Sequence, residues 1–185
     1  IWENVNPFLT NINEEDLQST NNSFRQSTFF NRTNSKFGLE HTYLNLFSKV
    51  LLVSGFDQRV KSSHEAKIRV NISKQFTILS SSVAENKQST SNYTSGRNYD
   101  LLILSQKGTL RWQPNTIFRI ALEGGYREKR NNPTISNLNA FITELGLDMK
   151  YNQLKKGSFN AQVKYFSMVY NGEGNSPIAY EMLES

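Results

Sequence analysis

Long runs in which apolar and polar residues alternate one by one constrain the fold of this chain more than any other feature. The run from Glu65 to Ile72 alternates without a break, and similar runs fill residues 117–127, 144–152 and 158–169. Successive side chains of a β-strand point to opposite faces of a sheet, so each run predicts a strand with one apolar and one charged face. Helical periodicity fits only residues 13–19, where we expect a short helical turn.

Turn-forming residues divide the chain into alternating short and long breaks. Compact turn signals occur at residues 33–36, 73–75, 113–116 and 154–157. Longer breaks rich in Ser, Asn and Gly lie between them, at residues 53–57, 88–98, 130–139 and 171–177. The order strand, short turn, strand, long loop therefore repeats about four times. Within one strand run, Gly124 and Gly125 indicate a strand bend or a place where aromatic rings pack over missing side chains.

This punctuation predicts an all-β fold, an antiparallel up-and-down meander of long hairpins in which sequential strands pair. The expected strands are residues 24–32, 37–52, 58–72, 76–87, 99–112, 117–129, 140–153 and 158–170, with a ninth strand at 177–184. Residues 1–23 are expected to form a polar N-terminal segment or linker, and residues 24–185 the β-domain. The chain opens without Met or a signal peptide, so its start was processed away or it is a fragment, and its end carries no structural stop signal. We therefore expect truncation at both ends and a β-domain that is incomplete at its C-terminus.

The length of the strands favours a β-barrel of the outer-membrane type, or part of one. Ten to fourteen residues rise about 33–46 Å, which at a tilt of about 45° is enough to cross an apolar band of about 25 Å. Short turns at one rim and long loops at the other are typical of such barrels, with the turns facing the periplasm. The alternative is a soluble meander that packs against another layer, with its charged sides in water.

The alternation assigns side chains to two faces. The residues expected on an inward polar face are Arg119, Glu123, Arg127, Asp148, Lys150 and Lys164. Those expected to face lipid or another apolar layer are Phe118, Ile120, Leu122, Leu145, Leu147, Phe159, Ala161 and Val163. Aromatic residues near strand ends are expected to form interfacial girdles: Phe37, Phe47, Phe56, Trp112, Phe118, Tyr126, Tyr151, Phe159 and Tyr170.

Composition removes most catalytic chemistry. Cysteine is absent, which excludes disulfides and thiolate sites, and the two histidines leave little material for a metal site or a triad. The acidic residues Glu14 to Asp16 and the pair Glu181 and Glu184 are interpreted as solvated side chains. We therefore expect no enzyme activity, no catalytic residue, no cofactor and no metal.

The net charge of +5 raises the question of a nucleic-acid partner. The basic residues are scattered, and they occupy the strand face opposite to the aromatic residues. A single-strand binding groove interleaves both kinds of residue on one face, so we expect no nucleic-acid partner. Only 37% of the residues are hydrophobic and no run approaches 18 apolar residues, so a transmembrane helix is not expected.

Six runs of the chain carry a resemblance to known proteins: residues 29–39, 55–59, 95–99, 113–119, 150–158 and, most strongly, 170–184. They resemble a segment of large, poorly characterised surface proteins of the Bacteroidetes lineage. The resemblance covers most of the chain from about residue 24 onward. It implies a C-terminal region rich in antiparallel strands, which continues through further hairpins to an aromatic C-terminus, and a location in the cell envelope. It supplies no catalytic residue.

Together these observations predict a non-enzymatic β-barrel component of a bacterial outer membrane, with a structural or partner-binding role in a larger complex. Its expected partners are outer-membrane lipid and other envelope proteins. Two alternatives stay open: a soluble surface-exposed β module, adhesin-like or glycan-binding, and a transport barrel.

Overall fold

A computed structural model describes residues 19–34, 36–52, 55–92, 96, 98–131, 138–153, 155–172 and 179–183. The elements are β1 (Ser19–Phe30), β2 (Phe37–Leu52), β3 (Gly55–Asn71), β4 (Phe76–Ser91), β5 (Tyr99–Trp112), β6 (Phe118–Asn131), β7 (Asn139–Gln153), β8 (Gly157–Asn171) and α1 (Ala179–Leu183). In the part of the chain that is described, no helix has the length and apolarity needed to cross a membrane.

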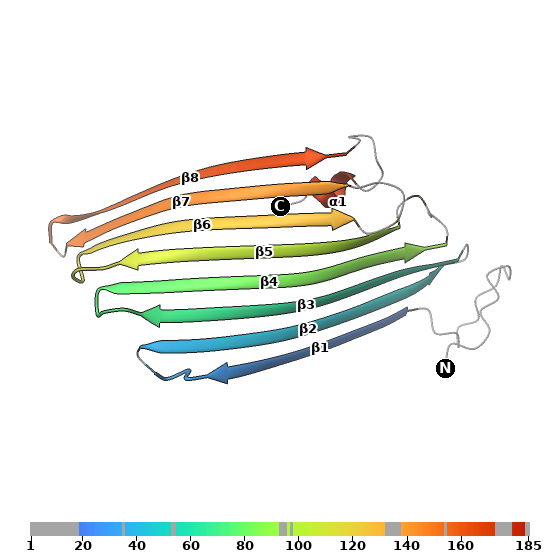
Figure 1. The fold of residues 1–185 in the computed structure, drawn as a ribbon, viewed down its shortest axis with the longest axis horizontal. Coiled ribbons are helices and arrows are strands. Elements are labelled where there is room, and N and C mark those ends of the chain that lie inside the picture. Colours follow the sequence, from blue (N-terminus) through green and yellow to red (C-terminus); the bar gives the residue numbers. More distant parts are fainter. Residues whose placement is uncertain are drawn as a thin grey trace.

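The eight strands form one sheet in the order of the sequence, and each strand pairs antiparallel with the next (Figure 1). The predicted all-β antiparallel meander is therefore confirmed. The sheet is open, because β1 and β8 each have one edge without a strand partner among the described residues. The predicted bounds of β2 and β5 agree with the structure, and most other strands begin or end within three residues of the prediction.

The first strand begins earlier than the sequence predicted. β1 starts at Ser19, so residues 19–23 belong to the sheet and not to a polar N-terminal segment. Their side chains show no apolar alternation, but Ser19 to Ser23 pair in register with Val50 to Leu46 of β2. Backbone hydrogen bonding extends the ladder whatever the side chains are. Residues 1–18, which hold most of the predicted helical turn at 13–19, lie outside the described residues.

The alternating strand directions place the connections at two rims (Figure 1). At one rim, the turn rim, β1 ends and β2 begins, β3 ends and β4 begins, β5 ends and β6 begins, and β7 ends and β8 begins. At the other, the loop rim, lie the end of β2 and start of β3, the end of β4 and start of β5, and the end of β6 and start of β7. The predicted long break at 53–57 is wrong, because Gly55 already belongs to β3 and only residues 53 and 54 separate that strand from β2. The strands there pair up to Leu52 and Gly55, which makes this hairpin tight.

Register gives the sheet two chemically different faces. Arg119, Glu123 and Arg127 of β6 share one face with their partners across the sheet, which we call the charged face. Phe118 and Leu122 share the other face, which we call the apolar face. The charged face is concave: Phe29 of β1, Lys67 of β3 and Lys107 of β5 line one hollow of about 510 Å³, although four strand-to-strand steps separate β1 from β5.

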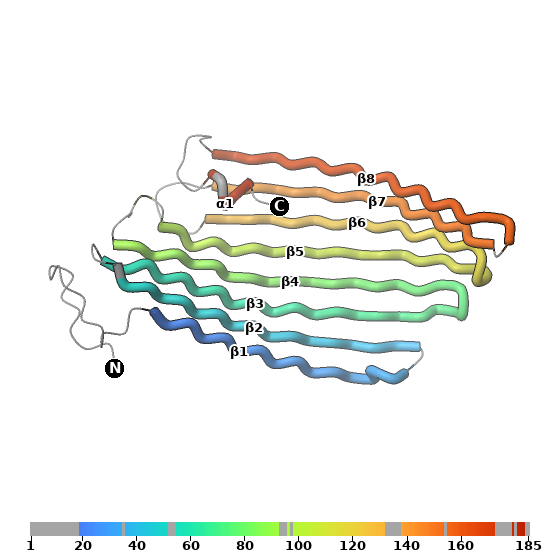
Figure 2. Tube along the Cα trace, turned by 180° about the vertical axis from the view of Figure 1, so that it is seen from behind, coloured from blue at the N-terminus to red at the C-terminus, as the bar shows by residue number. Residues whose placement is uncertain are grey.

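The segment predicted as a ninth strand is instead helical. Residues 179–183 form α1, which lies against the charged face at the loop rim (Figures 1 and 2). The residues buried here are Ala179 and Met182, three positions apart on one helical face. Ala, Glu, Met and Leu are also strong helix formers.

A small buried cluster lies where α1 meets the sheet. Met182 is fully buried against Leu101 of β5 and Ala140 of β7, with Tyr99 and Leu138 completing the cluster. Elsewhere in the described strands, many large apolar side chains stay exposed, among them Phe24, Leu122 and Val163. The sheet therefore has its core at one rim only, and most of its apolar surface has no covering layer among the described residues.

Candidate functional site

Charged side chains are concentrated on one face of the sheet. The cations of the charged face are Arg25, Arg59, Lys61, Lys67, Arg69, Lys87, Lys107, Arg111, Arg119, Arg127, Lys129, Lys150 and Lys164. Its anions are Glu40, Asp57, Glu65, Glu85, Glu123, Glu144 and Asp148. Within the described strands, the cations thus outnumber the anions by almost two to one.

The apolar face carries only four charged side chains in the described strands: Lys49, Asp100, Glu128 and Arg130. Each lies no more than three residues from the end of its strand at the loop rim. Arg130 and Glu128 bond to each other. From the turn rim to the neighbourhood of the loop rim, the apolar face of the eight described strands therefore carries no Asp, Glu, Lys or Arg.

The six residues that the sequence assigned to a polar face all lie on the charged face. Arg119 is opposite Lys150, Asp148 is opposite Ala121, and Glu123 and Lys164 lie on either side of Gly146. Arg127 is opposite Ile142. The eight residues assigned to the other side all lie on the apolar face, where Phe118, Ile120, Leu122, Leu145, Leu147, Phe159, Ala161 and Val163 oppose one another or other uncharged residues. Whether the first set meets water and the second meets lipid remains a prediction.

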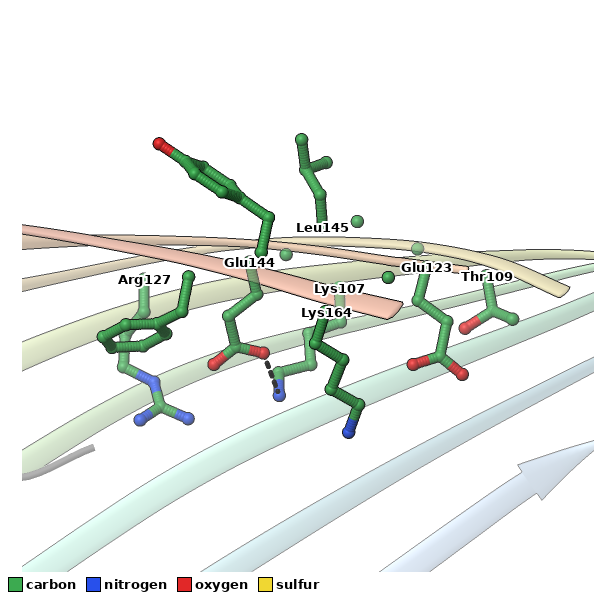
Figure 3. Close-up of a pocket in the computed structure, with 13 residues that line it drawn as sticks. Lys107, Thr109, Glu123, Arg127, Glu144, Leu145 and Lys164 are labelled. Atoms are coloured by element: carbon green, nitrogen blue, oxygen red, sulfur yellow. Dashed lines mark hydrogen bonds and ion pairs between the residues drawn. The ribbon is translucent and has the colours of Figure 1, made fainter. Parts of the chain in front are cut away.

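Glycine shapes the middle of the charged face. Lys107 of β5, Gly125 of β6 and Glu144 of β7 form one cross-strand row. Because Gly125 has no side chain, Lys107 reaches over β6 and its Nζ lies 3.2 Å from Oε2 of Glu144 (Figure 3). A Cβ at position 125 would lie 3.4 Å from Cγ of Lys107, in van der Waals contact, so any larger side chain would fill the space that Lys107 crosses. The glycine therefore permits an ion pair between strands that are not neighbours.

A second row has the reverse order of charge. Glu123 of β6, Gly146 of β7 and Lys164 of β8 lie side by side on the charged face. A Cβ at position 146 would lie 3.5 Å from Cβ of Glu123 and 3.9 Å from Cγ of Lys164. Glu123 and Lys164 both project into the concave space (Figure 3), but neither makes an ion pair within the described part of the chain.

The structure corrects the prediction made for Gly124 and Gly125. β6 runs without interruption through Gly124 and Gly125, so no strand bend occurs there. No aromatic ring covers them either: the atoms nearest to their missing Cβ positions belong to Leu145, Lys107 and Glu144. Sequence reasoning missed this role because adjacency across strands depends on register. The available signal was that Gly125 and Gly146 occupy charged-face positions in their alternating runs.

A third row lies nearer to the turn rim. Arg111 of β5, Ala121 of β6 and Asp148 of β7 face one another in register. Asp148 nevertheless pairs diagonally with Arg119, whose Nη2 lies 3.2 Å from Oδ1 of the carboxylate. The Nε atoms of Arg111 and Arg119 are buried and have no hydrogen-bond partner among the described residues. Two guanidinium donors, one in this row and one in the adjacent row of Arg119 and Lys150, are thus unsatisfied beside a single carboxylate.

Aromatic residues border the apolar face at the turn rim. Seven of the eight strands place one there: Phe30, Phe37, Phe76, Trp112, Phe118, Tyr151 and Phe159. Ring centroids lie 6.5 Å apart for Phe30 and Phe37, and 6.0 Å apart for Trp112 and Phe118. The belt is therefore nearly continuous from β1 to β8.

A second set of rings lies farther from the turn rim on the same face. Phe24 contacts Tyr43, and Tyr126 contacts Phe141, with ring centroids 6.1 and 6.3 Å apart. Phe47 and Phe56, predicted for a girdle, also lie on the apolar face. Tyr170, which was predicted with them, lies instead on the charged face, opposite Ala140, because its position in β8 has the other parity.

The described residues offer few side chains that could together bind a metal ion. In the described residues no group of three or more His, Cys, Asp and Glu side chains converges. The two histidines, His41 and His64, stack on the apolar face with Nε2 and Nδ1 3.4 Å apart.

A scan of protein-family models and searches of curated proteins and of solved structures found no match to this chain.

Proposed function

We propose that this chain forms part of a β-barrel in a bacterial outer membrane, with a structural or partner-binding role and no enzyme activity. One observation carries the proposal: the apolar face is exposed and free of formal charge across all eight described strands, except beside the loop rim. A face bathed in water gains solubility from scattered charges, whereas a face in lipid excludes them.

Exposed apolar side chains support the same proposal. On the apolar face, the large hydrophobic residues that remain exposed are Phe24, Phe30, Leu39, Ile68, Phe76, Ile78, Leu102, Leu104, Leu110, Leu122, Tyr126, Leu145, Tyr151, Phe159, Val163, Tyr165 and Val169. Soluble monomers rarely expose contiguous apolar patches larger than a few hundred Å². Lipid would cover this surface, and so would the hydrophobic layer of a larger assembly.

The spacing of the aromatic rings favours lipid over a protein layer. On β6, Phe118 and Tyr126 are eight residues apart, which corresponds to about 27 Å along the strand and roughly 20 Å after a tilt of about 40°. On β7, Tyr151 and Phe141 are ten residues apart, or roughly 25 Å after the same tilt. Outer-membrane barrels have an apolar band about 25 Å tall between two aromatic girdles.

Part of the polar set on the apolar face agrees with this arrangement. Asn86 and Gln88 of β4 lie toward the loop rim, together with the few charged residues of this face, whereas the neutral side chains of Ser80, Ser82 and Gln106 lie nearer the middle of the same face. A barrel wall that extends beyond the membrane on the loop side would place Asn86, Gln88 and these charged residues in water. The open edges of β1 and β8 would then pair with strands that complete the barrel.

Cysteine labelling tests the proposal, because the chain has no cysteine of its own. Two matched pairs of neighbours carry single substitutions: Leu122→Cys with Glu123→Cys, and Val163→Cys with Lys164→Cys. All four side chains are exposed in the described structure, so solvent exposure does not separate them. After reconstitution in lipid vesicles, a water-soluble maleimide should label positions 123 and 164 at least tenfold faster than positions 122 and 163.

Labelling in urea controls for intrinsic reactivity and should be equal at all four positions. Equal labelling of the folded variants, or recovery of the chain in the aqueous phase of a detergent partition, would contradict the membrane proposal. The soluble surface module would then be the better explanation of the same sheet.

A further inference from the structure

The charges near the turn rim of the charged face are unbalanced. Arg111, Arg119 and Lys150 lie on three neighbouring strands, β5, β6 and β7, and Asp148 is the one carboxylate in register with them. Arg119 and Lys150 are direct cross-strand partners, although they carry the same charge. Like charges opposite each other destabilise a sheet unless an anion lies between or beside them.

Hydrogen bonding leaves donors available at the same place. Asp148 is used by Nη2 of Arg119, and its side chain is only 16% exposed. The Nε–H groups of Arg111 and Arg119 are buried without an acceptor in the described part of the chain. An unmet buried donor costs about 1–3 kcal/mol, more when the group is charged, so two such donors show that this cluster of cations is short of acceptors.

The surroundings contain few competing acceptors. The β8 residues in register with Lys150 and Asp148 are Asn160 and Gln162, which are neutral. The nearest further carboxylate of this face is Glu123, two residues beyond Ala121 on β6 and diagonal to Arg111, and no ion pair joins it to Arg111. Among the described residues, Asp148 is the one carboxylate that forms an ion pair with any of the three cations.

From this cluster we propose that Arg111, Arg119 and Lys150 form a binding site for an oxyanion, a phosphate or sulfate group, on the charged face near the turn rim. Guanidinium groups donate parallel hydrogen bonds to oxyanions, and Lys150 adds a point charge. Asp148 orients Arg119 through the ion pair between them. The site does not depend on the membrane proposal, because its residues share one face whatever covers the other.

The test titrates inorganic phosphate into the full ¹⁵N-labelled chain at constant ionic strength, with chloride as the balancing anion. The Nε–H signals of Arg111 and Arg119 should shift with saturation, and sulfate should produce the same shifts. Lys150→Gln should raise the phosphate dissociation constant about tenfold, the effect of losing one hydrogen bond between charged groups. Lys150→Arg should keep the affinity within a few-fold.

Lys164→Gln is the matched control, since it removes the same charge from the same face at an exposed residue without an ion pair. It should change the affinity less than twofold. A non-saturating shift, or an equal loss of affinity in both Lys→Gln variants, would overturn the site and indicate screening by salt alone. The titration runs with or without detergent, so failure of membrane insertion would not affect its reading.

Discussion

The two ends of the charged face have the same parity but differ in covering. At the loop rim, Leu101 and Ala140 are at most 1% exposed where Met182 of α1 packs on the sheet, and Lys87 and Lys129 beside them bond to Glu181 of α1. At the turn rim, the same face carries Arg111, Arg119 and Lys150 without a covering element among the described residues. The difference shows that alternation defines which residues share a face, whereas a covering segment determines whether that face is wet or buried.

Weakening the contact between α1 and the loop-rim end of the charged face should produce the largest change in free energy. Met182→Ala removes the fully buried side chain that α1 places against Leu101 and Ala140, and we expect the docking of α1 to weaken by about 2–4 kcal/mol. A nitroxide attached through Leu183→Cys reports the change, because Leu183 is on α1 and 41% exposed. Its spectrum should change from restricted to mobile.

Met149→Ala provides the control for that measurement. Met149 lies on the apolar face, opposite Ile120 and Ala161, far from α1. The same substitution there should leave the nitroxide restricted. Equal mobility in both variants would mean that α1 is not held by the Met182 contact and that the two ends of the charged face do not differ in covering.

Removal of one carboxylate charge in each region compares how much an ion pair stabilises the protein under α1 and on the uncovered part of the charged face. Glu181 of α1 bonds to Lys87 at 2.6 Å with side chains 27% and 32% exposed, and Lys129 Nζ donates to the backbone oxygen of Glu181 at 3.0 Å. Glu144 bonds to Lys107 at 3.2 Å with both side chains more than 40% exposed. Glu181→Gln should therefore cost about 1 kcal/mol, and Glu144→Gln only a few tenths.

The measurement is the denaturant midpoint of unfolding at low salt and at 1 M salt. High salt should abolish the small effect of Glu144→Gln, since the pair is exposed, and should leave most of the Glu181→Gln effect. If the two variants lose equal stability at both salt concentrations, the covering helix does not strengthen the ion pair beneath it.

Much of this sheet could be predicted from the sequence. Alternation in residues 117–127 assigned Arg119, Glu123 and Arg127 to one side, and the turn signals at 113–116 separated β5 from β6 where the structure does. Local periodicity is enough for these features, because each follows from the geometry of a single strand.

The features that the sequence did not reveal depend on contacts between distant segments. The row Lys107, Gly125 and Glu144 requires the registers of two strand pairs, and no local pattern supplies them. The helix at residues 179–183 was read as a strand, because Met182 fits both alternation and helical spacing in so short a segment. Its burial against Leu101 follows from tertiary contact alone.

The smallest expected effect tests whether a missing side chain unites distant strands. In the unmodified sheet, a double-mutant cycle with Lys107→Gln and Glu144→Gln should give a coupling of about 0.2–1 kcal/mol, the range of exposed ion pairs. Gly125→Val should reduce this coupling to zero, because even a Cβ at this position lies 3.4 Å from Cγ of Lys107 and the branched side chain fills the path between the charges.

Gly124→Val is the control, since it places the same side chain one residue away on the apolar face, where the nearest atom to an added Cβ is Cδ2 of Leu145 at 3.8 Å. It should leave the coupling between Lys107 and Glu144 unchanged. Both valines gain strand propensity, so total stability should move in the same direction and does not separate the variants. The coupling energy between Lys107 and Glu144 is the quantity that separates the two variants. If this coupling is unchanged by Gly125→Val, the two side chains form their ion pair without the space that Gly125 leaves over β6, and the glycine is not needed to connect β5 with β7.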